Sequence, residues 1–461
     1  MSEERERVGV IGGGVAGLTA AYRLLQKGYR VRLFEAAPSM GGLMRTFEIP
    51  AEGGSASGGG GEPVECFYHH AFPTDTATVR LIEELGLGEH LTWRSSAVGI
   101  FYDGRIYPFV SPMDLLRFTP VGLIDRIRLG LMGLYLRRQR DGSRYESITA
   151  KEWVRRFAGQ RNLDVVWGPL LRGKFGDLGD ELVMTWLWNK IHLRFASRGA
   201  GPSQREVLGY LLGSFGAWIE ALIERIRELG GELEAGRPVQ RIVSDAGRVG
   251  LELAGEGQET VLFDAVVSTA ANKVFRRIAP PLPEAYADKL EGVPYQDTLC
   301  LVLTLKHPLS STYWLNINDR CIPFLAVIEH TNLIERERYG GQHVVYFSNY
   351  LNERSPLLRM DVDEVLALYL PHIKRVNPAF DESWIIDRWL FHGPDAQPVF
   401  TVGAGSRIPE HRTPVPGLYL ANMSQIYPQD RGQGHSILLG EKVADLVALD
   451  LARARAPVSQ A

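Results

Sequence analysis

A glycine-rich loop between a short buried strand and a helix constrains the fold of this chain more than any other feature. The segment VGVIGGGVAGLTAAYRLLQKGYRVRLFEA, residues 8 to 36, places Gly12, Gly14 and Gly17 at the G-x-G-x-x-G positions. Gly12 allows the tight turn, Gly14 lets a diphosphate approach the backbone, and Gly17 lets the helix pack closely on the strand. We therefore expect a parallel α/β nucleotide-binding unit at this end of the chain.

The acid that follows the next strand narrows the choice of nucleotide. Glu35 lies 18 residues beyond Gly17, where a carboxylate can accept both ribose hydroxyls of an adenosine. An arginine would suit a 2'-phosphate, so the acid disfavours NADP and leaves FAD and NAD. The diphosphate is expected on the helix N-terminus, against the backbone of Gly13 and Ala16.

The next segment, PSMGGLMRT, places Gly41, Gly42 and Arg45 directly after this acid. The pattern resembles the second signature of the superfamily of FAD-dependent amine oxidases, protoporphyrinogen oxidases and phytoene desaturases. The resemblance implies FAD as the cofactor, with Gly42 and Arg45 as contacts along its diphosphate and ribityl chain. An arginine there supplies a fixed fork of donors to a phosphate.

Two later stretches extend the resemblance along the chain. In GRPVQRIV, Val239 resembles the residue that contacts the adenine end of the cofactor. The C-terminal GLYLANMSQIYPQDRGQGHSILLGEKVADLV resembles the last flavin motif, a strand and loop followed by a helix. Most members have Gly and an acid after YLA, whereas this chain has Asn422 and Met423. We therefore assign the polar cofactor contacts here to Asp430, Gln433 and the backbone of Gly434.

These motifs predict an α/β fold with two domains that are both discontinuous in sequence. Residues 1–100, 205–275 and 386–461 are expected to form a Rossmann-like FAD-binding domain. Residues 101–204 and 276–385 are expected to form a mixed α+β substrate domain, in which apolar strands cover the flavin ring. The glycine-rich residues 53–61 are expected to be a surface loop.

Composition and charge exclude several other classes. The formal net charge of −3 gives no overall field that would attract nucleic acid. Three widely separated cysteines build neither a disulfide framework nor a zinc site, and the charged N-terminus lacks the apolar core of a signal peptide. We therefore expect a cytoplasmic protein with no metal and a small-molecule substrate, and the oligomeric state stays open.

Candidates for the reaction itself come from two stretches. VECFYHHAFPTDTATVRLIEELGLGEHLTW resembles the part of UDP-galactopyranose mutases in which a histidine-bearing loop lies near the flavin. Adjacent side chains point in different directions, so at most one of His69 and His70 is expected to face the site, and His70 is our candidate. A second stretch combines Trp and Phe with basic residues that would hold an acidic, partly apolar substrate. These residues are Arg172, Lys174, Lys190, Arg194 and Arg198, of which Lys174 and Arg172 are the reaction candidates.

Residues 123–140, LIDRIRLGLMGLYLRRQR, form a basic amphipathic stretch. Its apolar positions include Ile127, Leu131, Leu134 and Tyr135, against five arginines. Such a helix either packs on the core of its domain or lies on an anionic membrane, where it would admit a lipid-like substrate.

Three functions are compatible with these patterns. The leading one is an FAD-dependent oxidoreductase that removes a hydride from a C–N or C–C bond of a small acidic or lipid-like substrate. The second is a flavin isomerase similar to UDP-galactopyranose mutase, in which reduced flavin acts as a nucleophile without net redox. The third is a binding protein similar to the GDP-dissociation inhibitors, which use this fold without flavin.

Overall fold

The computed structural model describes most of the 461-residue chain. The described residues are 5–50, 61–196, 206–245, 247–255 and 259–455, without the side chains of residues 193–196. The predicted loop at 53–61, apart from Gly61, and Arg198 lie outside these ranges, as does the side chain of Arg194.

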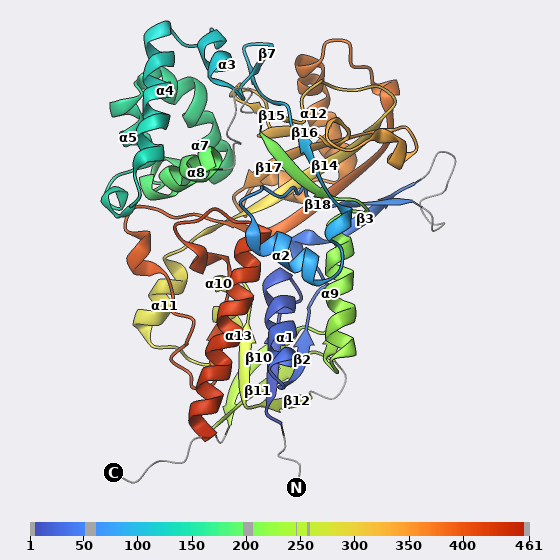
Figure 1. Ribbon diagram of the computed structural model, residues 1–461, viewed down its shortest axis with the longest axis vertical. Coiled ribbons are helices and arrows are strands. Elements are labelled where there is room, and N and C mark those ends of the chain that lie inside the picture. The colour runs from blue at the N-terminus through green and yellow to red at the C-terminus, as the bar shows by residue number, and fades with distance from the viewer. Residues whose placement is uncertain (1–4, 51–60, 197–205, 246, 256–258, 456–461) are drawn as a thin grey trace.

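A parallel sheet of five strands, in the order β19-β13-β1-β2-β9, forms the centre of the lower half of the molecule (Figure 1). Val8, Val10 and Leu33 are fully buried in it, as expected for apolar strands covered on both faces. Because all five strands are parallel, their carboxyl ends meet at one edge, where α/β sheets bind ligands. The strands are β1 (Arg7–Ile11), β2 (Arg30–Phe34), β9 (Glu232–Glu234), β13 (Ala265–Ser268) and β19 (Leu418–Leu420).

Helices cover one face of this sheet and a second, smaller sheet covers the other. The helices are α1 (Val15–Gln26), α9 (Gly216–Glu228) and α13 (Gln433–Arg455) (Figure 1). The smaller sheet is antiparallel and consists of β10 (Val239–Asp245), β11 (Arg248–Leu253) and β12 (Thr260–Phe263). The rings of Phe34 and Phe263 meet edge to face between the two sheets. The prediction of a Rossmann-like unit assembled from separate parts of the chain is thus confirmed.

A mixed sheet of seven strands, in the order β18-β14-β17-β16-β15-β6-β7, lies above the parallel sheet (Figure 1). Its longest strands pair antiparallel, with Leu301 opposite Phe347, and helix α12 (Val362–Val376) packs on one face. Its strands are β6 (Val98–Tyr102), β7 (Arg105–Pro108), β14 (Tyr295–Leu305), β15 (Trp314–Ile317), β16 (Ala326–Glu329), β17 (His343–Leu351) and β18 (Ile385–Pro398).

A helical lobe stands beside the seven-stranded sheet, around a core of its own (Figure 1). It contains α3 (Pro112–Arg117), α4 (Leu123–Arg138), α5 (Ala150–Phe157), α6 (Gln160–Asn162), a π-helical turn (Leu163–Trp167), α7 (Gly168–Phe175) and α8 (Met184–Ala196). The remaining elements connect the halves: α2 (Thr76–Glu84), α10 (Asn272–Ile278), α11 (Glu284–Glu291) and the strand pairs β3 (Thr46–Ile49) with β4 (Glu62–Glu65) and β5 (Leu91–Ser95) with β8 (Val207–Leu211).

Two of the expected domain boundaries fall inside strands of the seven-stranded sheet. The boundary between residues 100 and 101 cuts β6, and the one between residues 385 and 386 cuts β18. The sheet stays in one domain only if the first boundary moves to before β6 and the second to after β18, because β6 pairs with β15 and β18 pairs with β14.

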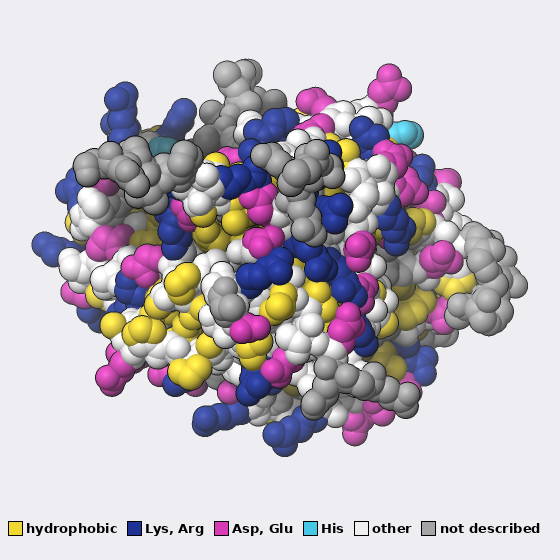
Figure 2. Space-filling view, turned by 90° about the horizontal axis from the view of Figure 1, so that it is seen from below, with side chains coloured by type: hydrophobic (Ala, Val, Ile, Leu, Met, Phe, Trp, Pro, Cys, Tyr) yellow, Lys and Arg dark blue, Asp and Glu magenta, His cyan; other side chains and the backbone are white. Residues whose placement is uncertain are grey.

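The lower end of the molecule, near which both termini lie in Figure 1, is shown from below in Figure 2. Basic and acidic side chains are interspersed on this face, with apolar ones between them. Such a mixture provides no uniform field for a polyanion.

Candidate functional site

The glycine-rich loop connects β1 to the N-terminus of α1 and leaves open space where a phosphate would bind. A Cβ added at Gly17 would lie 1.9 Å from the carbonyl oxygen of Gly12, so this position requires glycine for helix and strand to pack. A Cβ at Gly14 would meet no atom within 4 Å. Gly14 is also the N-cap of α1 and no side chain caps the helix, so the first N–H groups face this open space.

Glu35 is held beside the loop, as its place after β2 predicts. Its Oε2 accepts a hydrogen bond from the Gly13 N–H (2.6 Å) and its Oε1 accepts one from the Ala37 N–H (2.8 Å). The Glu35 carbonyl accepts the N–H of Arg237 (2.8 Å), which brings Val239, the first residue of β10, to the same end of the sheet. The predicted adenosine contacts Glu35 and Val239 are therefore brought together.

The second signature lies directly against the loop. The Gly41 N–H donates to the Gly13 carbonyl (2.8 Å). Gly42 has a left-handed φ of +57°, and a Cβ there would lie 3.2 Å from the Gly14 Cα, so glycine favours this close approach. Arg45 Nη2 donates to the His392 carbonyl (2.8 Å). The Arg45 guanidinium also lies over the ring of Phe67. Arg45 thus joins this segment to β18 and to Phe67, two residues after β4, beyond the phosphate loop.

The N-terminus of α13 is the fourth part of the expected cofactor site, after the glycine-rich loop, Glu35 and the segment of residues 41–45. Gln433 Nε2 donates to the His70 carbonyl (3.4 Å), and a Cβ at Gly434 would lie 3.3 Å from Thr78 Oγ1 of α2. Among the described atoms, the buried oxygens Asp430 Oδ1 and Gln433 Oε1 have no hydrogen-bond partner. Unsatisfied buried acceptors at a helix N-terminus fit a bound group that carries its own donors, such as a ribityl hydroxyl or a ring N–H.

The departure at YLAN has a structural reason. Asn422 caps a short 3-10 helix, accepting a hydrogen bond from the Ser424 N–H (3.0 Å). Its amide nitrogen donates to the Ala270 carbonyl (2.7 Å) and to Asn272 Oδ1 (2.9 Å). Asn422 therefore ties the end of β19 to the segment after β13.

A cationic cluster joins the two halves of the chain at this point. Asp430 Oδ2 pairs with Lys174 Nζ of α7 (2.6 Å) and with Lys190 Nζ of α8 (2.5 Å). Arg431, the next residue, donates to the hydroxyl of Tyr350 (2.5 Å), and its guanidinium lies over that ring. Lys174 Nζ lies above the rings of Trp186 and Tyr350. The site therefore places two lysines and an arginine around one carboxylate, against aromatic walls.

Burial shifts the ionisation of this cluster. Burial alone would raise the pKa of Asp430, but Lys174 and Lys190 outweigh it and hold that pKa far below its usual range. Burial, together with the charge of Arg431, lowers the pKa of Lys174 although Asp430 opposes the shift. The Lys174 ammonium therefore gives up its proton more easily than the ammonium of an exposed lysine does.

The two adjacent histidines meet different parts of the site: His70 contacts the start of α13 through its backbone carbonyl, and the ring of His69 lies within reach of the charge of Arg431. The His70 carbonyl accepts from Gln433, and His70 Nδ1 lies 3.2 Å from the Tyr313 hydroxyl. His69 Nδ1 lies 2.5 Å from the Phe67 carbonyl. Burial, with the nearby charge of Arg431, lowers the pKa of His69 to about 3, so its ring is neutral at physiological pH.

Arg172 is not brought together with Lys174. It lies two residues earlier on α7 and its side chain is exposed, on another side of the helix. Partial burial, followed by the charge of Arg320, lowers its pKa. The residues that sequence reasoning missed are Arg431 and Tyr350, 81 positions apart; the only signal was an arginine directly after Asp430.

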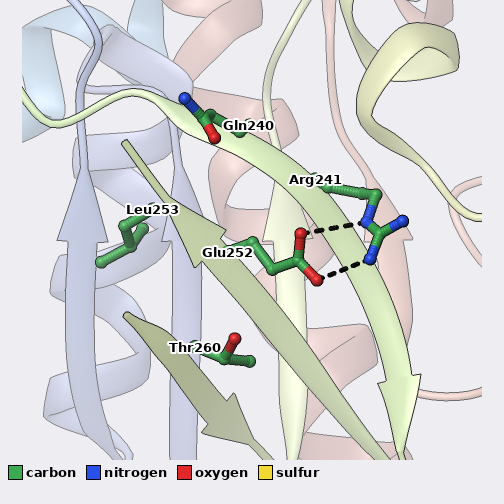
Figure 3. A pocket seen from close by; sticks show the side chains of 5 residues that line it. All are labelled: Gln240, Arg241, Glu252, Leu253 and Thr260. Atoms are coloured by element: carbon green, nitrogen blue, oxygen red, sulfur yellow. Dashed lines mark hydrogen bonds and ion pairs between the residues drawn. The ribbon is translucent and has the colours of Figure 1, made fainter. Parts of the chain in front are cut away.

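Elsewhere, a hollow on the small antiparallel sheet is lined by Gln240, Arg241, Glu252, Leu253 and Thr260 (Figure 3). Arg241 and Glu252 pair with each other across the strands, so the hollow offers no unpaired charge. In the described part of the chain, no three His, Cys, Asp or Glu residues are grouped to hold a metal ion. The described helices include none that is long and apolar enough to cross a membrane.

The Glu35 geometry gives a first prediction. Replacing Glu35 with alanine is expected to weaken FAD binding by about tenfold or more, because two ribose hydroxyls lose a charged acceptor. The fold should persist, since Glu35 is only partly buried. Fluorescence titration of the apoprotein with FAD measures the affinity, and Glu48→Ala, on the exposed side of β3, serves as the control. Unchanged affinity in Glu35→Ala would remove Glu35 from the adenosine site.

Comparison with known protein families identifies a match over nearly the whole chain. The family described as flavin containing amine oxidoreductase matches residues 15–446. The chain is 27% identical over 299 residues to AofH of Mycobacterium tuberculosis, which is named as a flavin-containing monoamine oxidase. This match covers 60% of each protein, so the chain spans less than two thirds of that relative. It is 24% identical to the coproporphyrinogen III oxidase of Propionibacterium freudenreichii, over 86% of this chain and 81% of that one.

Solved structures share the fold at lower identity. A protein named as a protoporphyrinogen oxidase, from an Exiguobacterium species, superposes with a TM-score of 0.75 at 19% identity, covering 97% of this chain and 99% of that one. Cyclohexylamine oxidase from Brevibacterium oxydans gives a TM-score of 0.71 at 16% identity, covering 98% and 100%. A reduced UDP-galactopyranose mutase gives 0.72 at 17% identity, covering 97% and 96%. At these identities the superpositions establish the architecture alone.

Proposed function

The chain belongs to the family of flavin-containing amine oxidoreductases, and from this premise we propose that it is an FAD-dependent oxidoreductase acting on a small, carboxylate-bearing substrate. FAD, the cofactor expected in this family, supplies the redox chemistry when bound by accepting a hydride from a C–N or C–C bond. The phosphate loop, Glu35, Gly42 and the N-terminus of α13 would hold it.

Arg431 is the observation that carries the substrate class. Its guanidinium is partly buried, and its hydrogen bond goes to the neutral hydroxyl of Tyr350 instead of a carboxylate. The carboxylate beside it, Asp430, already pairs with two lysines. A cation withdrawn from water without a matching anion is costly, and a carboxylate on the substrate would satisfy its planar donors.

The residues around Arg431 would orient this substrate. Trp186, Phe175 and Tyr350 enclose Lys174 Nζ and limit the access of water. The lowered pKa of Lys174 suits a group that exchanges a proton or holds a water molecule beside the reacting carbon. His69 stays neutral beside Arg431 and adds no charge to the site.

Binding of a simple carboxylate to the flavin-loaded protein tests this proposal. Benzoate is expected to perturb the visible flavin spectrum saturably, and Arg431→Met is expected to weaken benzoate binding by about tenfold or more while retaining FAD, because it removes a charge-assisted pair. Arg172→Met is the matched control, since Arg172 is exposed on another side of α7. Equal benzoate affinity in Arg431→Met and in the unaltered protein would contradict the carboxylate assignment.

The redox assignment needs its own experiment. The flavin-loaded protein is mixed anaerobically with an amino acid and, separately, with the amine that lacks its carboxylate. The amino acid should reduce and bleach the flavin far faster than the amine. If neither compound nor any other carboxylate donor reduces the flavin, and UDP perturbs the spectrum only after chemical reduction, the mutase-like isomerase becomes the better description. A purified protein that is colourless and refuses added FAD would favour the binding-protein alternative.

A further inference from the structure

Helices α3 and α4 expose an unusual number of large apolar side chains at the top of the molecule. Of the sixteen large apolar residues that are exposed in the described part of the chain, half lie on these two helices. We call this set the α3–α4 face. Its members are Met113, Leu116, Leu123, Ile124, Ile127, Leu131, Leu134 and Tyr135, with Ile124 75% and Leu123 60% exposed.

The α3–α4 face is one continuous surface. On α4 its members recur at helical spacing from Ile124 to Tyr135, so they share a side of the helix. Helix α3 packs beside this stripe, since a Cβ at Gly130 would lie 3.5 Å from the Leu115 side chain. Arg126 also donates to the Leu116 carbonyl (2.6 Å), which fixes the two helices together.

Apart from Tyr135, whose ring stacks on Trp153 and Phe157 of α5, the core of the helical lobe does not use this face. Leu129, Met132 and Leu136 are the side chains of α4 that are buried, and they belong to the core formed with α5, α7 and α8. These buried side chains therefore hold α4 in place, and the exposed apolar side chains on its other side are not needed for that packing. Contiguous exposed apolar side chains on a folded domain mark a surface that contacts something else.

The charges around the α3–α4 face select its partner. Arg117, Arg138 and Arg140 have exposed side chains on or beside the two helices. The acid of α3, Asp114, is occupied by its capping box with Ser111. A second copy of the same face would bring these arginines against one another, whereas anionic lipid headgroups would pair with them.

We propose that the α3–α4 face docks the protein on the surface of an anionic lipid bilayer. Helix α4 would lie in the plane of the interface with its apolar stripe among the upper acyl carbons and its arginines at the headgroups. Helix α4 also packs on α8, which carries Lys190, so the docked helix adjoins one helix of the cationic cluster.

Vesicle flotation of the flavin-loaded protein tests the proposal. Vesicles of phosphatidylcholine with about one third phosphatidylglycerol should carry the protein, and vesicles of phosphatidylcholine alone should carry far less. The double variant Ile127→Glu/Leu131→Glu is expected to lower the bound fraction by about tenfold, because it places two charges in the acyl region. Leu368→Glu and Leu449→Glu, exposed residues on α12 and α13, are the matched controls and should bind as the unaltered protein does.

The arginines have a separate readout. Arg138→Ala/Arg140→Ala should weaken binding and reduce its dependence on salt, because fewer headgroup pairs form. Retained flavin in every variant shows that each remains folded. The proposal is overturned if the unaltered protein stays unbound at millimolar anionic lipid, or if the Ile127→Glu/Leu131→Glu variant floats equally well. It is also overturned if that variant instead abolishes dimerisation of a protein that never binds vesicles, because the partner is then a second copy.

Discussion

Replacing Asp430 with asparagine is expected to destabilise the folded protein by about 3 to 5 kcal/mol, the usual cost of leaving a buried charge without its partner. Asp430 pairs with both Lys174 and Lys190, and the Lys174 side chain is only 9% exposed. Asparagine keeps the shape of aspartate but removes the negative charge. Urea unfolding at pH 7 measures the loss.

The sign of the pH dependence adds a second test of the same variant. The pKa of Lys174 is already lowered in the folded state, and without Asp430 it falls further. The unfolded chain then binds a proton that the folded chain lacks, so the stability of the variant rises with pH across that window. The gap between Asp430→Asn and the unaltered protein should therefore narrow between pH 7 and pH 9.

An exposed ion pair provides the control for Asp430. Asp180 pairs with Lys151, and both side chains are roughly half exposed. Asp180→Asn is expected to change the free energy of unfolding by less than about 1 kcal/mol, since water screens such pairs. If Asp430→Asn costs no more than Asp180→Asn, the cluster is hydrated and does not act as a buried charge centre.

The nucleotide-binding half was predictable because its signals are local. The turn at Gly12, the close packing at Gly17 and the acid at Glu35 lie within one strand, helix and strand, and short-range geometry fixes them. The Gly42 segment follows within the next seven residues and contacts Gly14 through backbone atoms. No knowledge of distant pairing was needed for any of these placements.

The cationic cluster could not be placed in the same way. Lys174 and Asp430 are separated by 256 positions, and they meet only because the helical lobe packs against the start of α13. Two of the expected boundaries cut strands for a related reason, since the pairing of β6 and β18 depends on strands far along the chain.

Helix α4 illustrates a different limit of sequence reasoning. Its sequence carries two apolar stripes, one with Leu129 and Leu136 and the other with Ile127 and Leu131. Periodicity alone does not say which of the two faces the core. The structure buries the stripe of Leu129 and exposes the stripe of Ile127.

Two glycine substitutions in the phosphate loop should separate folding from cofactor binding. Gly17→Ala is expected to destabilise even the flavin-free protein by about 3 kcal/mol or more, because its Cβ would lie 1.9 Å from the Gly12 carbonyl and α1 would have to move. Gly14→Ala is expected to cost less than about 1 kcal/mol in the flavin-free protein, because Gly14 has an ordinary φ of −78° and its Cβ would meet open space.

For Gly14→Ala, the expected loss is in FAD affinity and not in the stability of the flavin-free protein. The Cβ of Gly14→Ala would occupy the space expected for the diphosphate, so FAD binding should weaken by about tenfold or more although the protein stays folded. Urea unfolding of the apoproteins and fluorescence titration with FAD give the two quantities independently. In the described chain, a Cβ at Gly14 meets no atom within 4 Å, so only a bound group could clash with it. A Gly14→Ala variant that binds FAD as tightly as the unaltered protein would therefore mean that the diphosphate lies elsewhere.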